Sequence, residues 1–191
     1  MRIGFIRHGV TDWNLERRAQ GQLDIPLNDA GRKQAQALGK HLAGEPWDRI
    51  YASDLSRAKE TADIIAQALH LNVHTDKRLR EMSWGEAEGT TIEERLKKWG
   101  EDWRAKGLNI ESEQSILDRG ISFVEEILKT KPGRNVLVVS HGALLSRLFK
   151  HYIPHVVTTQ PVYNTSLTIM QFVDGKWECD LYNSTAHLSD E

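Results

Sequence analysis

The stretch GFIRHGVTDWN, residues 4–14, decides the fold assignment. A short apolar run over residues 3–6 leads directly to Arg7, His8 and Gly9, and the chain then becomes polar. A short apolar run of this kind is typical of a buried strand. We therefore expect a strand whose carboxyl end carries a cation, an imidazole and a glycine.

A second stretch, NVLVVSHGALLSRLF at residues 135–149, repeats this arrangement. The near-continuous apolar run of residues 136–139 is followed by His141 and Gly142 and then by a helical pattern. Ligands of open α/β sheets bind beyond the carboxyl ends of the strands. Either histidine alone is equally well interpreted as a polar residue leaving the core. The matching pair favours two adjacent parallel strands that bring both imidazoles to one site.

Composition excludes several classes of function. The 191-residue chain is long enough for one well-buried core, and it is 39% hydrophobic and 27% charged with a formal net charge of -2. Without a basic excess, we expect no nucleic-acid partner and no membrane partner. The single cysteine, Cys179, fits a reducing compartment, and no leader or apolar run of 18 residues is evident. We expect a cytoplasmic protein.

The remaining chain alternates between helical and strand patterns. A weak strand is predicted at residues 50–51, and a hairpin at residues 167–181, where Asp174-Gly175 suits a type I′ turn. Asn28 is the expected cap of the first long helix. The predicted apolar helix faces are Ala35, Leu38 and Leu42; Ala58, Ala62, Ile65 and Leu69; Leu117, Ile121, Val124 and Leu128; and Leu144, Leu145 and Leu148. This order predicts an α/β fold, a mostly parallel sheet with helices on both faces and an antiparallel edge hairpin.

Residues 85–113 stand apart from this alternation. They are highly charged and carry Ile92, Leu96, Trp99 and Trp103 at helical spacing, with too few apolar residues for a core of their own. We interpret them as a helical insertion or lid within a single domain spanning residues 1–191. The apolar stripe is interpreted first as an anchor to the main domain. The alternative is a roof over the site at the sheet edge that favours apolar or aromatic ligands.

Arg57 lies in an unusual position within YASDLSRAKETAD, residues 51–63. It falls in the first turn of a predicted helix that Ser53, Asp54 or Ser56 could cap. A cation there opposes the helix dipole, so an anionic partner such as a phosphate would explain it. A solvated surface arginine is the alternative.

Together these residues suit phosphoryl transfer. Fixed cations and N–H donors stabilise the charge that spreads over the phosphoryl oxygens, and Arg7, Arg57 and His141 could supply them. A neutral imidazole can act as nucleophile and form a phosphohistidine. The leaving oxygen needs a proton, for which Glu81, in RLREMSWGEAEG at residues 78–89, is one candidate among ordinary surface glutamates. The scheme requires no metal, and no HExxH or CxxC motif occurs.

Five motifs in this order resemble the histidine phosphatase superfamily, in its phosphoglycerate mutase-like branch. They are RHGVTDWN, RAQGQLDIPLNDAGR, SDLSRAKETA, LREMSWGEAEG and VVSHGALL, which begin at residues 7, 18, 53, 79 and 138. The resemblance implies a three-layer α/β/α fold, and we expect no cofactor and no metal. The resemblance also implies that His8 is the phosphorylated nucleophile, that Arg7, Arg57 and His141 bind the phosphoryl group, and that Glu81 is the proton donor.

The same resemblance implies a substrate-binding role for three further residues. Asn14 matches the asparagine of the family's RHGxTxxN pattern, and Gln20 and Gly21 match its QG pair. These residues are expected to line the phosphate pocket.

The family contains both phosphatases and mutases. The stretch REMSWGEAEG and the short insertion are closer to small-molecule phosphatases, although Ala87 stands where a tryptophan is usual and Ile110 where a glycine is usual. We expect a phosphatase acting on a small phosphate ester. The alternatives are a cofactor-dependent phosphoglycerate mutase and a non-catalytic protein that binds a phosphorylated ligand. A homo-oligomer formed through the terminal hairpin is also an expectation.

Overall fold

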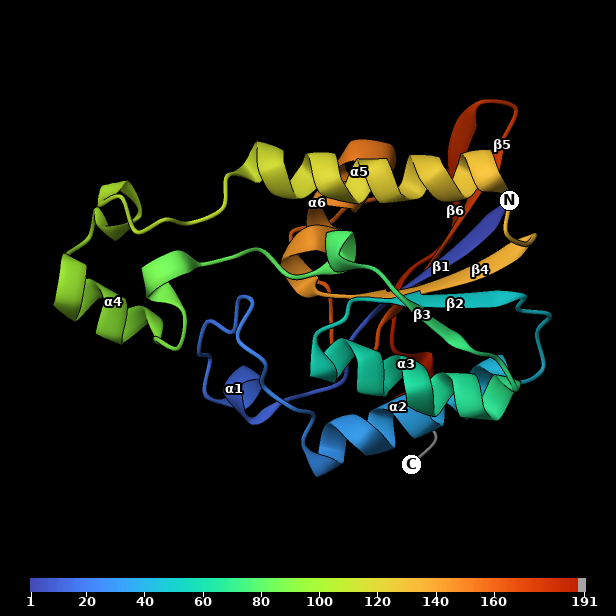
Figure 1. The fold of residues 1–191 in the computed structure, drawn as a ribbon, viewed down its shortest axis with the longest axis horizontal. Coiled ribbons are helices and arrows are strands. Elements are labelled where there is room, and N and C mark those ends of the chain that lie inside the picture. Colours follow the sequence, from blue (N-terminus) through green and yellow to red (C-terminus); the bar gives the residue numbers. More distant parts are fainter. Residues whose placement is uncertain (189–191) are drawn as a thin grey trace.

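The computed structural model describes residues 1–188, which form a three-layer α/β/α sandwich around one six-stranded sheet (Figure 1). The strand order is β3-β2-β4-β1-β5-β6. The first four strands are parallel to one another, β5 pairs antiparallel with β1, and β6 pairs antiparallel with β5. The strands are β1 (Arg2–Arg7), β2 (Arg49–Ala52), β3 (Val73–Thr75), β4 (Asn135–Ser140), β5 (Leu167–Val173) and β6 (Lys176–Ser184). The predicted fold class, including the antiparallel edge hairpin, is confirmed.

Helices cover both faces of the sheet. In Figure 1, α2 and α3 lie on one side of the strands, and α5 and α6 on the other. The helices are α1 (Asp12–Leu15), α2 (Asp29–Leu42), α3 (Ser56–Leu69), α4 (Ile92–Trp99), α5 (Glu113–Thr130) and α6 (Gly142–Tyr152). The predicted cap of α2 is confirmed, because the Gly31 N–H donates to the Asn28 side chain over 2.9 Å. No helix within residues 1–188 is long and apolar enough to cross a membrane.

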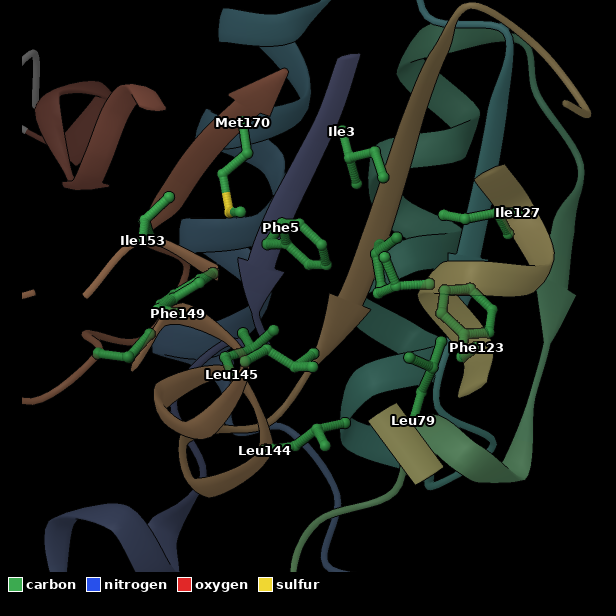
Figure 2. Close-up of a cluster of buried hydrophobic side chains, with 14 of the residues drawn as sticks. Ile3, Phe5, Leu79, Phe123, Ile127, Leu144, Leu145, Phe149, Ile153 and Met170 are labelled. Carbon is green, nitrogen blue, oxygen red and sulfur yellow. The ribbon is translucent and has the colours of Figure 1, made fainter. Parts of the chain in front are cut away.

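Alternating side chains of β1 enter two separate cores. Ile3 and Phe5 belong to the core under α5 and α6, whereas Ile6 belongs to the core over α2 and α3. Figure 2 shows the first of these, where the Phe5 ring meets the Phe149 ring of α6 edge to face, with 5.8 Å between centroids. Because both faces of the strand are buried, its carboxyl end is held rigidly, which fixes the residues that follow it.

The predicted buried face of α5 is displaced from the observed one. Val124 is buried as predicted, but Leu117, Ile121 and Leu128 are only partly buried. The fully packed residues are Ile116, Gly120, Phe123, Val124 and Ile127. The reason is that Gly120 faces α6, where a Cβ atom would lie 2.8 Å from a methyl group of Leu144. The apolar periodicity carried no signal for this close helix approach.

The predicted anchoring stripe of the insertion is wrong for two of its four residues. Ile92 and Leu96 are 45% and 42% exposed, whereas Arg95 of the same helix is buried. The Arg95 guanidinium lies 5.5 Å from the Trp84 ring and 4.8 Å from the Trp103 ring. Cation–π contacts therefore turn a charged face of α4 inward. Contrary to expectation, the insertion has a small apolar cluster of its own, formed by Ala87, Trp103 and Leu108.

The terminal hairpin has the predicted turn. Asp174 and Gly175 both adopt positive φ values, +48° and +78°, as a type I′ turn requires.

Candidate active site

The two histidines of the RHG and SHG stretches lie side by side at the carboxyl edge of the sheet. Strands β1 and β4 pair in parallel with Arg7 opposite Ser140, and the His8 N–H donates to the Ser140 carbonyl over 2.9 Å. The imidazole centroids of His8 and His141 are 5.1 Å apart, with the rings inclined at 60°. Both imidazoles are buried. The predicted meeting of the two histidines is therefore found.

The tautomer of His8 follows from one hydrogen bond. Its Nδ1 lies 2.7 Å from the Gly9 carbonyl oxygen, which can only accept a hydrogen bond. Nδ1 must therefore carry the proton, which leaves a lone pair on Nε2 whenever the ring is neutral. Burial lowers the pKa of His8 well below its ordinary value, and the charges of Arg57 and Arg7 lower it further. His8 is thus held neutral with Nε2 as the free nitrogen.

Gly9 allows the end of β1 to pack directly on α2. A Cβ atom at this position would lie 2.5 Å from the carbonyl oxygen of Gly31, which no other residue could tolerate without a backbone shift. The Gly9 N–H donates to the Thr61 Oγ1 of α3 over 3.0 Å. The glycine after His8 therefore fixes the nucleophile between two helices, as well as letting the chain turn.

His141 combines complete burial with unpartnered nitrogens. It occupies the N-cap position of α6 without a side-chain cap hydrogen bond. Within residues 1–188 neither ring nitrogen has a hydrogen-bond partner. Burial lowers its pKa well below the ordinary value, with the nearby charge of Arg57 adding to the effect. A neutral imidazole here can donate one N–H to a group placed beside it.

Arg57 is fully buried. Two of its guanidinium nitrogens bind main-chain carbonyl groups, and the third has no partner within residues 1–188. Nη1 donates to the Leu23 carbonyl over 2.8 Å, and Nη2 to the Gly21 carbonyl over 2.7 Å. Nε is buried without a partner among residues 1–188. Burial lowers the pKa of Arg57 to about 10, so the side chain remains a cation at neutral pH.

The predicted caps of the Arg57 helix are wrong. The N-cap residue of α3 is Leu55, and it makes no side-chain cap hydrogen bond. Asp54 instead forms a bidentate ion pair with Arg80, at 2.7 and 2.6 Å. The Ser56 N–H donates to Asp24 over 2.7 Å, so a loop distant in sequence supplies the first acceptor. Nothing in the local pattern distinguished this from an ordinary cap.

Arg7 extends from the end of β1 toward the same region. Nη1 donates to the Val162 carbonyl over 2.7 Å, and Nε is buried without a partner among the described residues. Burial lowers the pKa of Arg7, and the nearby Glu81 charge partly opposes this shift. Both arginines therefore interact electrostatically with both Glu81 and His8.

Glu81 lies against the N-terminus of α6. Its carboxylate accepts hydrogen bonds from the N–H groups of Met82 (2.8 Å), Ala143 (3.1 Å) and Leu144 (3.3 Å). It therefore caps the helix that His141 begins, by satisfying backbone N–H groups of the first turn. Sequence reasoning from the residues alone did not single out Glu81. Its placement beside His141 becomes evident only in three dimensions.

The three predicted substrate-binding residues have different surroundings. The Asn14 Oδ1 accepts from the Thr11 N–H (3.1 Å) and from the Asn164 amide (3.3 Å), so it is part of a capping box. Gln20 is buried, and its Oε1 has no partner within residues 1–188. Gly21 contributes a carbonyl to Arg57 and a backbone φ of +54°.

Sequence reasoning missed Asn164, which supports the nucleophile from a distant loop. Its amide donates to the His8 carbonyl over 2.9 Å, and the Thr165 N–H donates to the Arg7 carbonyl over 2.9 Å. No motif marked this loop. The run of three polar residues, Asn164 to Ser166, before the predicted strand was the only available signal.

The buried unpartnered atoms of the site include three donors, because each arginine contributes one Nε–H and the neutral His141 ring contributes one N–H. Among the described residues these unpartnered atoms are the Nε atoms of Arg7 and Arg57 and the two ring nitrogens of His141, beside the Gln20 Oε1. Buried donors without partners are rare and costly, so such a cluster indicates a ligand that accepts several hydrogen bonds. A phosphoryl group, with several acceptor oxygens and a negative charge, meets this requirement.

Comparison with known proteins agrees with this geometry. The profile of the histidine phosphatase superfamily (branch 1) matches residues 3–185. The uncharacterized phosphatase PhoE of Bacillus subtilis is 36% identical over 190 residues, which cover 98% of this chain and 96% of PhoE. Phosphoglycerate mutase-like protein 4 of Arabidopsis thaliana is 36% identical over 200 residues, with 98% and 87% covered. The solved structure of Bacillus stearothermophilus YhfR superposes with a TM-score of 0.88, 31% identity and 98% of each chain covered. The chain therefore belongs to the histidine phosphatase superfamily, branch 1, as an enzyme of the phosphatase type.

Proposed function

We propose that this enzyme hydrolyses small phosphate monoesters through a phosphohistidine formed on Nε2 of His8. The observation that carries the proposal is the 2.7 Å hydrogen bond from Nδ1 to the Gly9 carbonyl. It leaves Nε2 with the free lone pair, and burial beside two arginines favours the neutral ring. A neutral imidazole with a defined free nitrogen is the form that attacks phosphorus.

The first half of the reaction transfers the phosphoryl group to the enzyme. Nε2 of His8 forms a bond to phosphorus while the bond from phosphorus to the ester oxygen breaks. Arg7, Arg57 and His141 would stabilise the charge on the phosphoryl oxygens, since their unpartnered nitrogens are the buried donors of the site. The Glu81 carboxyl would give its proton to the leaving oxygen, and the alcohol departs.

The second half returns the enzyme to its starting state. The Glu81 carboxylate takes a proton from a water molecule whose oxygen attacks phosphorus. The bond from phosphorus to Nε2 breaks, inorganic phosphate leaves, and His8 again carries a lone pair on Nε2. No step requires a metal ion, because cationic side chains and N–H donors meet the phosphoryl charge. A cytoplasmic location remains a prediction from the single cysteine.

The experiment that tests the proposal measures phosphate release from a panel of monoesters that includes 3-phosphoglycerate, with its products followed by NMR. Release of inorganic phosphate from several esters, together with acid-labile phosphate trapped on His8 by rapid quenching, is the expected result. Formation of 2-phosphoglycerate without free phosphate would identify a mutase instead. Binding of phosphate esters without turnover would identify a non-catalytic binding protein.

A further inference from the structure

The segment that carries Glu81 is held in place by side chains from elsewhere in the fold. The segment, residues 78–81, begins within the 3₁₀ turn Lys77–Leu79 and belongs to no strand or long helix. Each of its four carbonyl groups accepts a hydrogen bond from a side chain. The pairs are the Arg78 and Arg80 carbonyls with Arg119 Nη1, the Leu79 carbonyl with Ser140 Oγ (2.8 Å), and the Glu81 carbonyl with Arg119 Nη2 (3.0 Å) and Gln22 Nε2 (3.2 Å).

A single guanidinium therefore spans most of this segment. Arg119 of α5 donates to three of the four carbonyls, including that of Glu81 itself. Its opposite edge forms a bidentate ion pair with Glu111, from Nε to Oε1 at 2.9 Å and from Nη2 to Oε2 at 3.0 Å. Both side chains are largely buried, at 18% and 12% exposure. Such a planar fork fixes its partners in direction as well as in distance.

Glu111 also holds the chain on the other side of Glu81. Its Oε2 accepts from the Ser83 N–H over 3.1 Å, and its own N–H donates to the Ser83 carbonyl over 2.9 Å. Burial opposes ionisation of Glu111, but the hydrogen bonds from Arg119 and Ser83 outweigh it and hold the pKa of the carboxyl below its ordinary value. The Arg119–Glu111 pair thus constrains the main chain both at Glu81 and two residues beyond it.

We propose that Arg119, oriented by Glu111, is a positioning residue that fixes Glu81 for proton transfer to the leaving oxygen. The inference rests on the proposed function, in which Glu81 is the proton donor. Arg119 acts through the Glu81 main chain, so its removal should misplace the donor while the hydrogen bonds of His8, Arg7 and Arg57 stay in place. Small displacements of a catalytic group cost large factors in rate. Esters whose leaving oxygen needs a proton should therefore be affected far more than esters that leave as stable anions.

The test compares Arg119→Gln and Glu81→Gln on two esters, β-glycerol phosphate and p-nitrophenyl phosphate. The readout is kcat/KM, which reports the first half of the reaction and excludes the hydrolysis of phosphohistidine that both esters share. For Arg119→Gln we expect kcat/KM to fall about 10- to 100-fold on the alkyl ester and less than about 3-fold on the aryl ester. Arg119→Lys, which keeps the charge but not the fork, should lie between the wild type and Arg119→Gln. The double variant with Glu81→Gln should be no slower on the alkyl ester than Glu81→Gln alone, since both remove one function.

The matched control is Arg2→Gln. Arg2 forms a partly buried ion pair with Glu45, at 2.6 Å, at the opposite end of β1 from the site. Arg2→Gln should leave the ratio of kcat/KM for β-glycerol phosphate to kcat/KM for p-nitrophenyl phosphate unchanged. Glu111→Gln, which removes the charge but retains the shape, provides a second variant should Arg119→Gln not fold, and it should show the same selective loss.

Equal losses on both esters in the Arg119 and Glu111 variants would overturn the inference, as would additive losses in the double variant. Either result would assign the pair to structure alone. If Arg119→Gln loses activity equally on both esters but still forms phosphohistidine from p-nitrophenyl phosphate, only the inference about Arg119 fails and the proposed function stands. If the wild type forms no phosphohistidine, the proposed function and the inference both fall.

Discussion

The imidazoles of His8 and His141 lie 5.1 Å apart because their strands are neighbours in parallel register. They nevertheless differ in their hydrogen bonds. His8 is tied through Nδ1 to the Gly9 carbonyl, whereas both nitrogens of His141 are unpartnered among residues 1–188. One ring therefore has a fixed tautomer, as a nucleophile needs, and the other can adopt the tautomer that a bound phosphoryl oxygen requires.

His8→Ala should abolish turnover and phosphohistidine formation, with kcat reduced by at least about 10³-fold, because the attacking nitrogen is lost. The fold should persist, since Gly9 and the strand pairing remain. Quench-flow trapping with radiolabelled substrate measures the first effect, and thermal unfolding the second. His141→Ala is the informative comparison. It should slow turnover while acid-labile phosphate still accumulates on His8. Trapped phosphohistidine in His8→Ala would remove the nucleophile assignment.

Glu81→Gln should lower kcat/KM for alkyl phosphates by about 10² to 10⁴-fold while lowering that for p-nitrophenyl phosphate far less. The amide cannot supply the proton that an alkoxide needs, whereas nitrophenolate leaves without one. The slope of log kcat/KM against the leaving-group pKa, measured over a series of esters, should become steeper. An unchanged slope would mean that another group is the acid.

The strand ends of the site were predictable because the signals are local. A short apolar run followed by His-Gly is read directly from residues 3–9 and again from residues 136–142. The Asn28 cap and the Asp174-Gly175 turn are equally local, and both are confirmed. Local signals therefore sufficed for the fold class and for the meeting of His8 with His141.

The remaining features could not be predicted because they depend on contacts between distant residues. Arg95 is buried where its guanidinium lies beside the stacked rings of Trp84 and Trp103, whereas helical periodicity favours apolar residues for that face. Likewise, Asn164 reaches the His8 carbonyl across 156 residues of sequence. Hydrogen bonds from side chains to distant main-chain groups leave no periodic pattern, so supporting residues escape analysis of one sequence.

Chelation should leave activity unchanged. The phosphoryl charge is met in the proposed mechanism by Arg7, Arg57 and His141, none of which requires a metal ion. We expect kcat/KM for p-nitrophenyl phosphate to remain the same after dialysis against EDTA and after addition of Mg²⁺ or Zn²⁺. A loss that an added metal restores would contradict metal-independent chemistry.

Arg57→Lys should weaken phosphate recognition despite keeping the charge. The lysine ammonium has its three N–H donors on one nitrogen, so it lacks the planar spread with which separate guanidinium nitrogens bind the Gly21 and Leu23 carbonyls and face a phosphoryl oxygen. Loss of one charge-assisted hydrogen bond corresponds to about 1.5–3 kcal/mol, or about 10- to 100-fold in kcat/KM. The inhibition constants of inorganic phosphate and vanadate should rise in parallel. Unchanged inhibition with reduced kcat/KM would assign Arg57 to holding the loop alone.

Stability should decline as the pH falls below about 6.5, the ordinary pKa of histidine. Burial lowers the pKa of His8 and His141 well below that value, and that of His187 to about 4. Between the folded-state pKa and the ordinary pKa of histidine, the unfolded chain binds protons that the folded chain does not. The free energy of unfolding therefore decreases as the pH falls through this range. Above about pH 6.5 these histidines cause no further change in stability. Each such histidine contributes a slope of about 1.4 kcal/mol per pH unit.

His187→Asn isolates one of these contributions. The His187 Nε2 lies 3.3 Å from the Thr165 Oγ1, and its ring is buried beside His41. Urea unfolding at pH 7.0, 6.0, 5.5, 5.0 and 4.5 should show that the variant loses stability toward acid less steeply than the wild type, by about one proton. The slope is the readout because loss of the Thr165 contact lowers stability equally at every pH. The same substitution at the exposed His151 is the matched control. A slope identical to that of the wild type would show that His187 does not take up a proton on unfolding, and that the acid sensitivity arises at other groups.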